Sequence, residues 1–417
     1  MNARQERGMQ IAAMKRISRI DEFTWRVPSQ FNNDKAYQVN METSAPRCTC
    51  PDHQELGVKC KHVFAVECVI QRELFPDGTE TKTQTVVVTE KIRKTYKQEW
   101  KAYNAAQTNE KDKFLSLLRD LCSRVETPKQ KTGRPRVQLA DAIFAACFKV
   151  YSTFSGRRFM CDLRDAQAKG YVEKAIHYNL IFRALENAEL TPILESLITE
   201  SSLPLKAVES NFAVDSSGFS VSRFVKWHDE KYGKEQSGRD WVKAHICCGV
   251  KTNVITAVEI HDRHAADSPL FRPLVDATAK NFTIGEVSAD KGYSARENFK
   301  IVDRHGGTGF IAFKSGTTGS VGGLYSKMFH YFQYRQEEFL AHYHRRSNVE
   351  STFSMVKAKF RDHVRSKTDV AMKNEVLCKI LCHNICVLIQ EMYELGIEPE
   401  FWTEKNDRPA AIPMASA

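Results

Sequence analysis

The stretch FAVDSSGFSVSRF, residues 212–224, is the first of three strand-like runs that decide the fold of this chain. Two further runs of the same kind follow, VKAHICCGV at 242–250 and VITAVEIHD at 254–262. Helical and strand-like patterns then alternate, and long helical patterns fill 332–361 and 371–394. Three consecutive strands followed by alternating helices and strands predict a mixed α/β sheet that is covered by helices.

The composition is that of an ordinary globular chain with a basic balance. The chain has 417 residues, 42% of them hydrophobic and 27% charged, which predicts two to three domains. No run approaches about eighteen apolar residues, so we expect no membrane span, and the N-terminus lacks the apolar stretch of a secretory signal. The formal net charge of +10 favours an acidic partner, nucleic acid before membrane.

The run YHRRSNVESTFSMVK at 343–357 combines two helical stripes. At 100° per residue the polar stripe spans only about 60°, and it consists of Tyr343, Arg346, Glu350 and Lys357. The apolar stripe beside it consists of Val349, Phe353, Val356 and Phe360. Such a helix can pack on a core and present a carboxylate between cations, which suits a metal ion and a polyanionic substrate. Taken alone, the polar stripe also fits a solvated helix face.

Two strand-associated aspartates could join Glu350 at one edge of the sheet. Asp215 lies in or just after the first strand, and Asp290 ends the later strand in GEVSAD. Three converging carboxylates could bind two magnesium ions about 4 Å apart. Taken separately, Asp215 also fits an Asx-turn and Asp290 a strand end. The nearby acidic competitors are Glu259, Asp262 and Asp267, of which the last also fits a helix N-cap or first-turn anion.

Four potential metal ligands lie within fifteen residues near the N-terminus, in the order Cys48, Cys50, Cys60 and His62. Two ligand pairs separated by a short loop can close a tetrahedral zinc site. The metal would then close a core too small to fold by hydrophobic burial alone. His53 competes with His62 as a ligand, and a chance grouping of reduced cysteines is the alternative.

The carboxyl-terminal patterns resemble the DDE transposases of bacterial insertion sequences that carry the signature Y-x2-R-x3-E-x6-K. The polar stripe at 343–357 matches this spacing without a gap. DKGY at 290–293 is similar to the D-x-G-Y element around the second aspartate of the group, and DSS at 215–217 to the setting of the first. SKTDVAMKNEVLCKILCHNI at 366–385 resembles the closing helix of the group. The resemblance covers about residues 130–395.

This resemblance implies an RNase H-like catalytic core that binds two divalent ions, Mg²⁺ or Mn²⁺, through Asp215, Asp290 and Glu350. It also implies that transposon-end DNA is contacted or positioned by Tyr343, Arg346 and Lys357. Asp290 and Glu350 lie only sixty positions apart, too few for the large β insertion of some members. Hairpin-type processing of the flanking strand, which such insertions support, is therefore not implied.

The amino-terminal pattern resembles the SWIM zinc finger, whose signature is CxC, a variable spacer and CxH. Two strand-like stretches within 20–43 precede the ligands, and a helical stretch from Lys61 to Glu73 follows, as in that module. The resemblance covers about residues 15–75. It implies one zinc ion and an interaction with DNA or protein.

A basic segment, TGRPR at 132–136, resembles half of an AT-hook, in which an Arg-Pro stretch enters a narrow minor groove. Arg134 and Arg136 would then contact DNA. The segment also fits a basic entry to the helix that starts near Val137. Within the apolar helices that follow, the phosphate-contact candidates are Arg157 and Arg158.

Together these patterns predict a transposase that cuts double-stranded DNA at inverted-repeat ends and joins the 3′-hydroxyls to target DNA. We expect a homodimer, cytoplasmic and nucleoid-associated, with no membrane partner. The alternatives are a non-enzymatic DNA-binding protein derived from a transposase and a nuclease without strand transfer. The expected regions are a zinc-binding α+β module at 1–75, a linker and charged helix at 76–127, a helical DNA-binding region at 128–204, an RNase H-like α/β domain at 205–395 and a disordered tail at 396–417.

Overall fold

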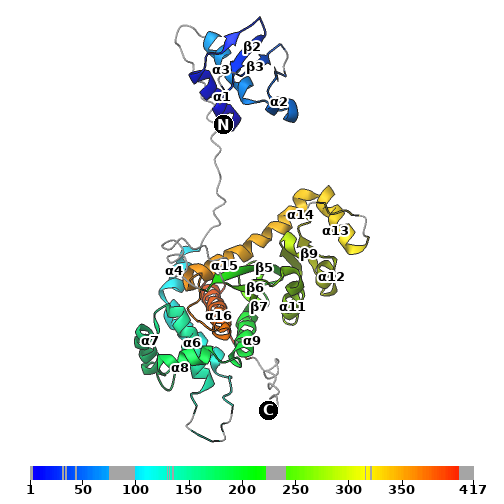
Figure 1. Ribbon diagram of the computed structural model, residues 1–417. Coiled ribbons are helices and arrows are strands. Elements are labelled where there is room, and N and C mark those ends of the chain that lie inside the picture. The colour runs from blue at the N-terminus through cyan, green and yellow to red at the C-terminus, as the bar shows by residue number, and fades with distance from the viewer. Residues whose placement is uncertain are drawn as a thin grey trace. The chain divides into compact units, whose positions relative to one another are not determined.

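The computed structural model describes residues 3–402 except 31, 33–34, 43–44, 75–98, 129, 131, 134–135, 222–240, 315 and 320–321. Most of the expected linker, Arg134 and most of the expected tail therefore lie outside the described residues. The chain divides into two compact units, Met1–Tyr96 and Lys97–Ala417, and each is described by itself (Figure 1).

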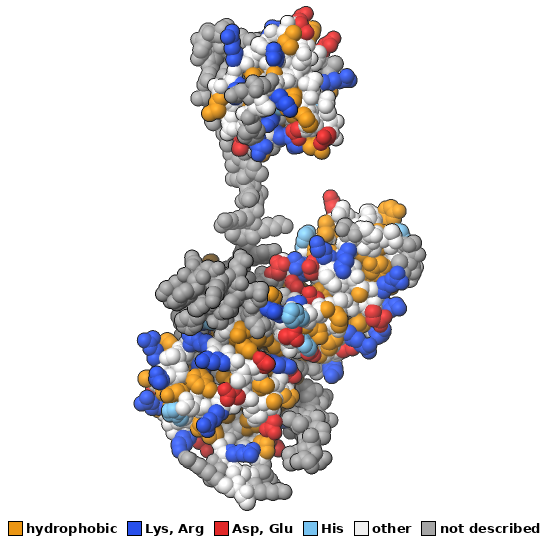
Figure 2. Space-filling model, in the orientation of Figure 1, with side chains coloured by type: hydrophobic (Ala, Val, Ile, Leu, Met, Phe, Trp, Pro, Cys, Tyr) orange, Lys and Arg blue, Asp and Glu red, His pale blue; other side chains and the backbone are white. Residues whose placement is uncertain are grey.

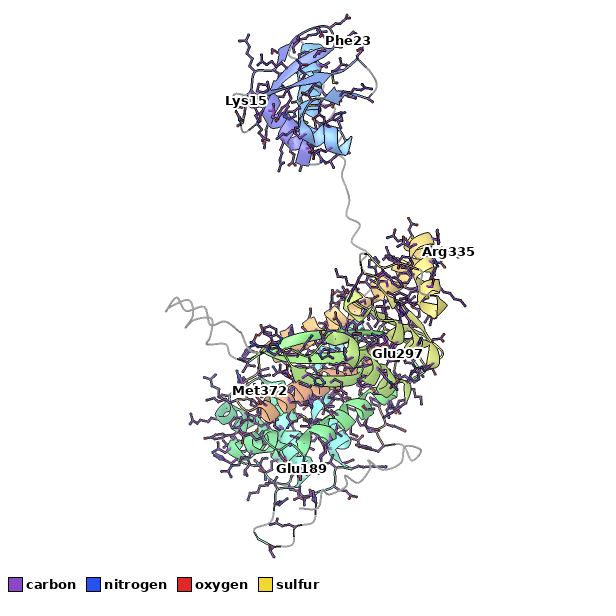
Figure 3. All side chains as sticks on the ribbon, turned by 45° about the vertical axis from the view of Figure 1, so that its right-hand side comes forward. Lys15, Phe23, Glu189, Glu297, Arg335 and Met372 are labelled. Atoms are coloured by element: carbon purple, nitrogen blue, oxygen red, sulfur yellow. The ribbon has the colours of Figure 1, made fainter. Side chains whose placement is uncertain are left out.

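The first unit is a four-stranded antiparallel sheet with helices packed on it. Its elements are α1 (Ala3–Met14), β1 (Ser18–Arg19), β2 (Thr24–Pro28), β3 (Ala36–Asn40), β4 (Arg47–Cys48), α2 (Pro51–Leu56) and α3 (Lys61–Leu74). Alternation along β2 and β3 buries Trp25, Val27 and Val39, while Phe23 in the β1–β2 turn stays exposed (Figure 3). A Cβ at Gly8 would lie 2.6 Å from the Cβ of Phe64, so glycine permits the close approach of α1 to α3.

The second unit contains a five-stranded sheet in the order β7-β6-β5-β8-β9. Its strands are β5 (Asn211–Ser220), β6 (Trp241–Gly249), β7 (Ile255–Asp262), β8 (Glu286–Ala289) and β9 (Thr308–Ile311). The first three pair antiparallel, whereas β8 and β9 run parallel to β5. The predicted mixed α/β sheet is confirmed.

Helices cover both faces of this sheet (Figure 1). The helices and 3₁₀ turns after β7 are α11 (Asp267–Ala279), η2 (Lys291–Tyr293), α12 (Arg296–Arg304), α13 (Gly323–Tyr334), α14 (Gln336–Tyr343), η3 (His344–Arg346), α15 (Ser347–Phe360) and α16 (Asp369–Glu394). Alternate residues of β5 enter two different cores. Phe212 and Val214 pack in the core of α11 and α12, whereas Ala213 and Phe219 pack in the core of α15 and α16.

The helical part before the sheet shares the second of these cores. It consists of α4 (Trp100–Thr108), α5 (Glu110–Cys122), α6 (Leu139–Ser152), α7 (Gly156–Ala168), α8 (Tyr178–Leu185), α9 (Leu190–Ser202) and η1 (Leu203–Leu205). The expected charged helix is thus present as α4 and α5, and both pack on α16. Helix α16 lies between the sheet and α6 and α8, and it packs side by side with α9, which contacts β7 directly (Figure 1).

Asn384 ties α16 to both neighbours. Its Oδ1 accepts the backbone N–H of Ile255 on β7 at 2.8 Å, and its Nδ2 donates to Ser201 Oγ at the end of α9 at 3.0 Å. Among the described residues, α16 is the helix long and apolar enough to cross a membrane, but 78% of its apolar window is buried inside the protein. The length and apolarity of this helix therefore serve the protein core.

Candidate active site and metal centre

Two parallel strands bring Asp215 and Asp290 next to each other. The register of β5 and β8 puts Val214 opposite Ala289, so the following residue on each chain segment is an aspartate. Val214 and Ala289 both enter the core of α11 and α12, and successive side chains alternate. The side chains of the two aspartates therefore leave the backbone on the other face of the sheet, where η3 contacts both strands. Neighbouring strands lie about 4.8 Å apart, which places the aspartates within reach of a common ligand.

Helix α15 carries Glu350 to the same place. Its predicted apolar stripe is buried, from Val349 to Phe360, and anchors the helix on the sheet. Arg346, which ends η3 just before the helix, donates from Nη2 to Glu350 Oε1 at 2.7 Å and from Nη1 to Asp215 Oδ2 at 3.2 Å. One guanidinium thus bridges the helix-borne carboxylate and a strand-borne one.

The periodicity of the polar stripe at 343–357 predicts a single α-helix. This prediction is wrong, because the helix is interrupted. Tyr343 ends α14, and the 3₁₀ turn η3 separates it from α15. Residues three apart lie on the same side in a 3₁₀ turn as well, which is why the sequence pattern conceals the break. The stripe nevertheless stays together: Arg346 Cζ lies 5.9 Å from the centre of the Tyr343 ring.

Lys357 reaches the strand that carries Asp215. Its Nζ donates to Ser217 Oγ at 2.6 Å. Sequence reasoning missed Ser217, although a period of two along β5 puts it on the same face as Asp215 and could have identified it. Burial lowers the pKa of Lys357.

The acidic site has an unbalanced negative charge. Burial raises the pKa of Asp215, and the negative charges of Asp290 and Glu350 raise it further. The hydrogen bond from the Ser216 N–H and the charge of Arg346 lower the pKa, but the net shift is upward. The side chain of Asp215 is 21% exposed, whereas that of Glu350 is 56% exposed. Carboxylate oxygens with uncompensated charge fit a hard divalent cation as a donor set. In the described part of the chain, however, these three carboxylates do not form a group close enough together to hold a metal ion as they stand.

The competing acidic residues are occupied elsewhere. Asp267 is the first residue of α11, as the first-turn role predicted, and accepts a hydrogen bond from Ser216 Oγ at 2.8 Å. It also forms an ion pair with Lys243 at 2.6 Å. Burial raises the pKa of Asp267, but the contacts with Lys243 and Ser216 lower it by more, so the pKa lies below its ordinary value. Because Ser216 alternates with Asp215 along β5, Asp267 lies on the opposite face of the sheet. Glu259 contacts His261, and Asp262 accepts the backbone N–H of His264.

The cysteines and the histidine predicted to bind zinc form one buried group. The ligand atoms of Cys48, Cys50, Cys60 and His62 all lie within 4.8 Å of one another. His62 Nδ1 lies 3.8 Å from the sulfur of Cys48 and 3.9 Å from that of Cys60. Ligands of a tetrahedral zinc ion lie about 3.6–3.8 Å apart, so the group fits that ion.

The two candidate histidines differ in their contacts. His53 Nδ1 lies 2.8 Å from the carbonyl oxygen of Val58 and is not part of the group. His62 is buried beside the Tyr37 ring, and its Nε2 has no hydrogen-bond partner among the described residues. A hydrogen bond with Cys48 lowers the pKa of Cys60, whereas the pKa of Cys48 is raised by the same bond. Cysteine sulfur and histidine nitrogen are the ligands that a structural zinc ion takes.

The basic segments are on the surface. Arg136 is exposed, and its backbone N–H donates to Gln130 Oε1 at 3.1 Å. Arg157 and Arg158 are exposed in the first turn of α7, where Arg157 Cζ lies 6.0 Å from the centre of the Tyr178 ring. On the face shown in Figure 2, Lys and Arg side chains are dispersed among acidic and apolar ones. No contact of these arginines distinguishes a DNA-binding role from a solvated one.

Comparison with known proteins agrees with both sequence resemblances. The family described as transposase DDE domain matches residues 206–385, and the SWIM zinc finger matches residues 37–67. The DDE domain implies a divalent metal, and the SWIM finger with its Cys/His group implies zinc. No curated protein sequence matches the chain.

Among solved structures, the chain is similar to a piggyBac transposase in a synaptic complex with hairpin DNA. The sequence identity is 9% and the TM-score 0.34, over 72% of this chain and 77% of that one. A likeness at this level establishes neither fold nor function. The two family matches, by contrast, coincide with the two sites: the chain combines an N-terminal SWIM zinc finger with a transposase DDE domain.

Proposed function

We propose that the chain is a DNA transposase that cleaves at the inverted-repeat ends of its element and transfers the 3′-hydroxyl ends to target DNA. One observation carries the proposal. Inside the matched DDE domain, aspartates from two adjacent parallel strands and Glu350 from α15 converge on the same edge, where Arg346 links Asp215 to Glu350.

Asp215, Asp290 and Glu350 would hold two Mg²⁺ or Mn²⁺ ions, which supply Lewis acidity for in-line attack on phosphorus. In the absence of an ion, Arg346 is the counter-charge of Asp215 and Glu350. Once those carboxylates serve a metal, the guanidinium is free to donate to a DNA phosphate, for which its planar geometry is suited. Arg346 would thus exchange one anionic partner for another.

The flanking residues of the stripe have matching roles in this proposal. Lys357, fixed by Ser217, would present its ammonium to the backbone of the transposon end. Tyr343, packed against Arg346, would limit where that guanidinium can move. Two DNA ends have to be cut and joined together, so a homodimer on double-stranded DNA in the cytoplasm is part of the proposal. The SWIM finger would supply a further DNA or protein contact.

The test is a strand-transfer assay with the full chain and a donor plasmid that carries the DNA flanking its gene. Wild type with Mg²⁺ or Mn²⁺ is expected to release the element and join it to target DNA. Glu350→Gln keeps the side-chain shape but removes the metal-binding charge, and the rate should fall at least about 10³-fold. Glu338→Gln is the matched control, since Glu338 is an exposed glutamate of α14 that contacts Arg335 and Tyr331.

The outcomes separate the proposal from its alternatives. Metal-dependent joining that Glu350→Gln abolishes and Glu338→Gln retains supports transposition. Cleavage without joined product would identify a nuclease instead. If the chain binds the element ends but shows no metal-dependent cleavage, it is a non-enzymatic DNA-binding protein, and the enzymatic proposal is wrong.

A further inference from the structure

The carboxylates of Asp215 and Asp290 are oriented in the same way. Asp215 Oδ1 accepts the backbone N–H of Ser216 at 2.8 Å, and Asp290 Oδ1 accepts that of Lys291 at 2.7 Å. The direction of each carboxylate therefore depends on the position of the residue that follows it in the chain. Helix α11 contacts both of the segments concerned, β5 and η2.

One edge of β5 is open beside Asp215. Strand β8 pairs with β5 only as far as Val214, whereas β6 pairs with it up to Ser220. In the described part of the chain, residues 215–219 therefore have a strand neighbour on one side only. A backbone with a single paired edge is held less firmly, so side-chain contacts gain importance in this open stretch.

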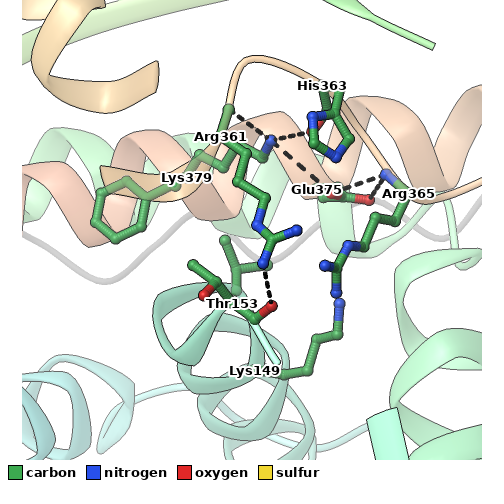
Figure 4. Close-up of a pocket in the computed structure, with 9 residues that line it drawn as sticks. Lys149, Thr153, Arg361, His363, Arg365, Glu375 and Lys379 are labelled. Atoms are coloured by element: carbon green, nitrogen blue, oxygen red, sulfur yellow. Dashed lines mark hydrogen bonds and ion pairs between the residues drawn. The ribbon is translucent and has the colours of Figure 1, made fainter. Parts of the chain in front are cut away.

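The far end of the open stretch is fixed by the segment after α15. Ser220 forms a parallel bridge with His363. Lys379 of α16 holds this segment by donating to the carbonyl oxygens of Arg361 and His363 at 3.1 and 2.6 Å (Figure 4). The open stretch is thus fixed at both ends, and the part between them depends on side chains.

Two consecutive serines fix the middle of the stretch, one on each face of the sheet. Ser217 Oγ accepts a hydrogen bond from Lys357 on the face of the acidic site. Ser216 Oγ donates to Asp267 Oδ1 on the opposite face at 2.8 Å. Because the N–H of Ser216 orients Asp215, the contact with Asp267 reaches that carboxylate through a single residue.

Asp267 is itself held in place. Its Oδ1 also lies 2.6 Å from Lys243 Nζ, and the same ammonium donates to the carbonyl oxygen of Ala265 at 3.0 Å. Burial lowers the pKa of the neighbouring His245 to about 4, so this ring is neutral at pH 7. Lys243 therefore balances the charge of Asp267. The pair adds no net charge behind Asp215, and its influence there is geometric.

The first turn of α11 also reaches Asp290, by a second route. Asn298 of α12 is 4% exposed, and its Nδ2 donates to Ser268 Oγ at 3.1 Å and to the carbonyl oxygen of Tyr293 at 2.8 Å. Tyr293 ends η2, the turn that follows Asp290, and its N–H donates to the carbonyl oxygen of Asp290 at 2.9 Å. Ser268 is the neighbour of Asp267, so one helical turn supports both aspartates.

We propose that Asp267 and Asn298 are positioning residues of the acidic site. Asp267 fixes the carboxylate of Asp215 through Ser216. Asn298 links the same turn of α11 to the turn after Asp290. The inference rests on the proposed function, because that function assigns the two aspartates to metal. Removing a residue that holds a metal ligand in place typically weakens metal binding about 10–100-fold, and links through the backbone favour the lower end.

The test measures the affinity of the zinc-loaded full chain for Mn²⁺ by electron paramagnetic resonance, without DNA. Ser216→Ala and Asp267→Ala are each expected to bind Mn²⁺ about tenfold more weakly than wild type. Ser216→Thr keeps the hydroxyl group and should restore the wild-type affinity. A purely structural role of Asp267 in α11 would not distinguish alanine from threonine at position 216.

Two matched controls remove the same groups elsewhere. Ser220→Ala changes an exposed serine on the same face of β5. Asp276→Ala removes a carboxylate from the same helix, where it pairs with Arg272 and His305. Both variants should bind Mn²⁺ as wild type does. If Ser216→Ala binds as tightly as Ser220→Ala, the proposal is overturned.

Double variants show whether the two links are separate. Asp267→Ala should add nothing to the effect of Ser216→Ala, because both break the same link. Asn298→Ala should add its own factor to Ser216→Ala, because it acts on the other aspartate. If the effects of Asp267→Ala and Ser216→Ala multiply instead, Asp267 does not act through Ser216, and the proposal is wrong.

Hydrogen exchange gives a readout that needs neither metal nor DNA. Ser216→Ala and Asp267→Ala should speed exchange in residues 215–219. Faster exchange confined to α11 in Asp267→Ala would show that Asp267 serves only its own helix, which overturns the proposal. Neither measurement depends on transposition. A chain that shows the expected Mn²⁺ affinities but joins no DNA would therefore contradict the proposed function and leave this inference standing.

Discussion

The Cys/His group of the first unit and the acidic site of the second both gather ligand side chains, but they do so in opposite ways. The group of Cys48 and His62 comes from fifteen successive residues, is wholly buried and is already spaced for a metal. The acidic site is assembled from β5, the end of β8 and α15, and its Glu350 is more than half exposed. A closed ligand set suits a structural ion, whereas a site for chemistry has to keep room for its substrate.

The difference also concerns stability. The first unit has a small core into which the three ligand cysteines are packed, so its metal and its fold belong together. The acidic site lies on a sheet with large cores on both faces, and its carboxylates add electrostatic strain that Arg346 relieves only in part. Metal binding should therefore be required for the first unit to fold, whereas in the second unit it should only reduce the repulsion between the carboxylates.

The largest expected effect follows from removing a zinc ligand. His62→Ala is expected to lose zinc and to unfold the first unit, because a structural zinc ion contributes about 10–16 kcal/mol. Hydrogen exchange of peptides from α1 and α3, together with the bound zinc content, measures both. His53→Ala should behave as wild type, since its side chain only contacts Val58. If His62→Ala kept its full zinc content and slow hydrogen exchange, the first unit would not depend on this ligand for folding, and the prediction would be wrong.

A smaller effect of the opposite sign is expected at Asp215. Its folded-state pKa is raised, so its ionised form is disfavoured in the folded chain and costs stability above the ordinary value of 3.8. Asp215→Asn should therefore raise the free energy of unfolding at neutral pH by up to about 1 kcal/mol while abolishing strand transfer.

The pH dependence checks the sign of this effect. The gain of Asp215→Asn over wild type should be absent below pH 3.8, grow as pH rises through the raised pKa and then stay constant. Denaturant titrations at a series of pH values without divalent metal give this difference directly. A variant that is less stable than wild type at neutral pH would show that the Arg346 bridge outweighs the strain.

The smallest effect is expected from Ser217→Ala, which removes the acceptor that fixes Lys357. The loss of one hydrogen bond, about 0.5–1.5 kcal/mol, should lower the rate of end cleavage by a few-fold to about tenfold. Tm should fall by no more than a few degrees, because only one part-buried hydrogen bond is lost. Ser351→Ala removes an exposed hydroxyl of α15 that bonds only its own helix, and it should leave the rate unaltered. Equal rates for the two variants would show that the position of Lys357 is unimportant.

The two sites were predictable from the sequence to different degrees. The predicted zinc ligands lie close together in the chain, so their spacing alone indicated the group, although only the structure shows that His53 lies outside it. The acidic residues were predictable by order and element type, because the ends of adjacent parallel strands necessarily meet. What spacing could not show is that Arg346 would stand between Asp215 and Glu350, since rotamers and ion pairs depend on three separate elements.

The burial of two lysines was not predictable at all. Lys149 and Lys379 lie inside apolar helical patterns, where a single lysine is normally expected to extend to solvent. Both are instead buried, because α6 and α16 are covered on every side by other elements. A pattern within one helix carries no information about how many neighbours will enclose it.

The position of α16 has a consequence for how the chain can be divided. Because this helix carries the core of the sheet on one side and that of α4 to α9 on the other, neither part keeps its interior without the other. Gene fragments that begin at the sheet would leave a wide apolar face open to water and to self-association. A division of the chain should therefore fall between Tyr96 and Lys97, the boundary of the two compact units, and not within the second unit.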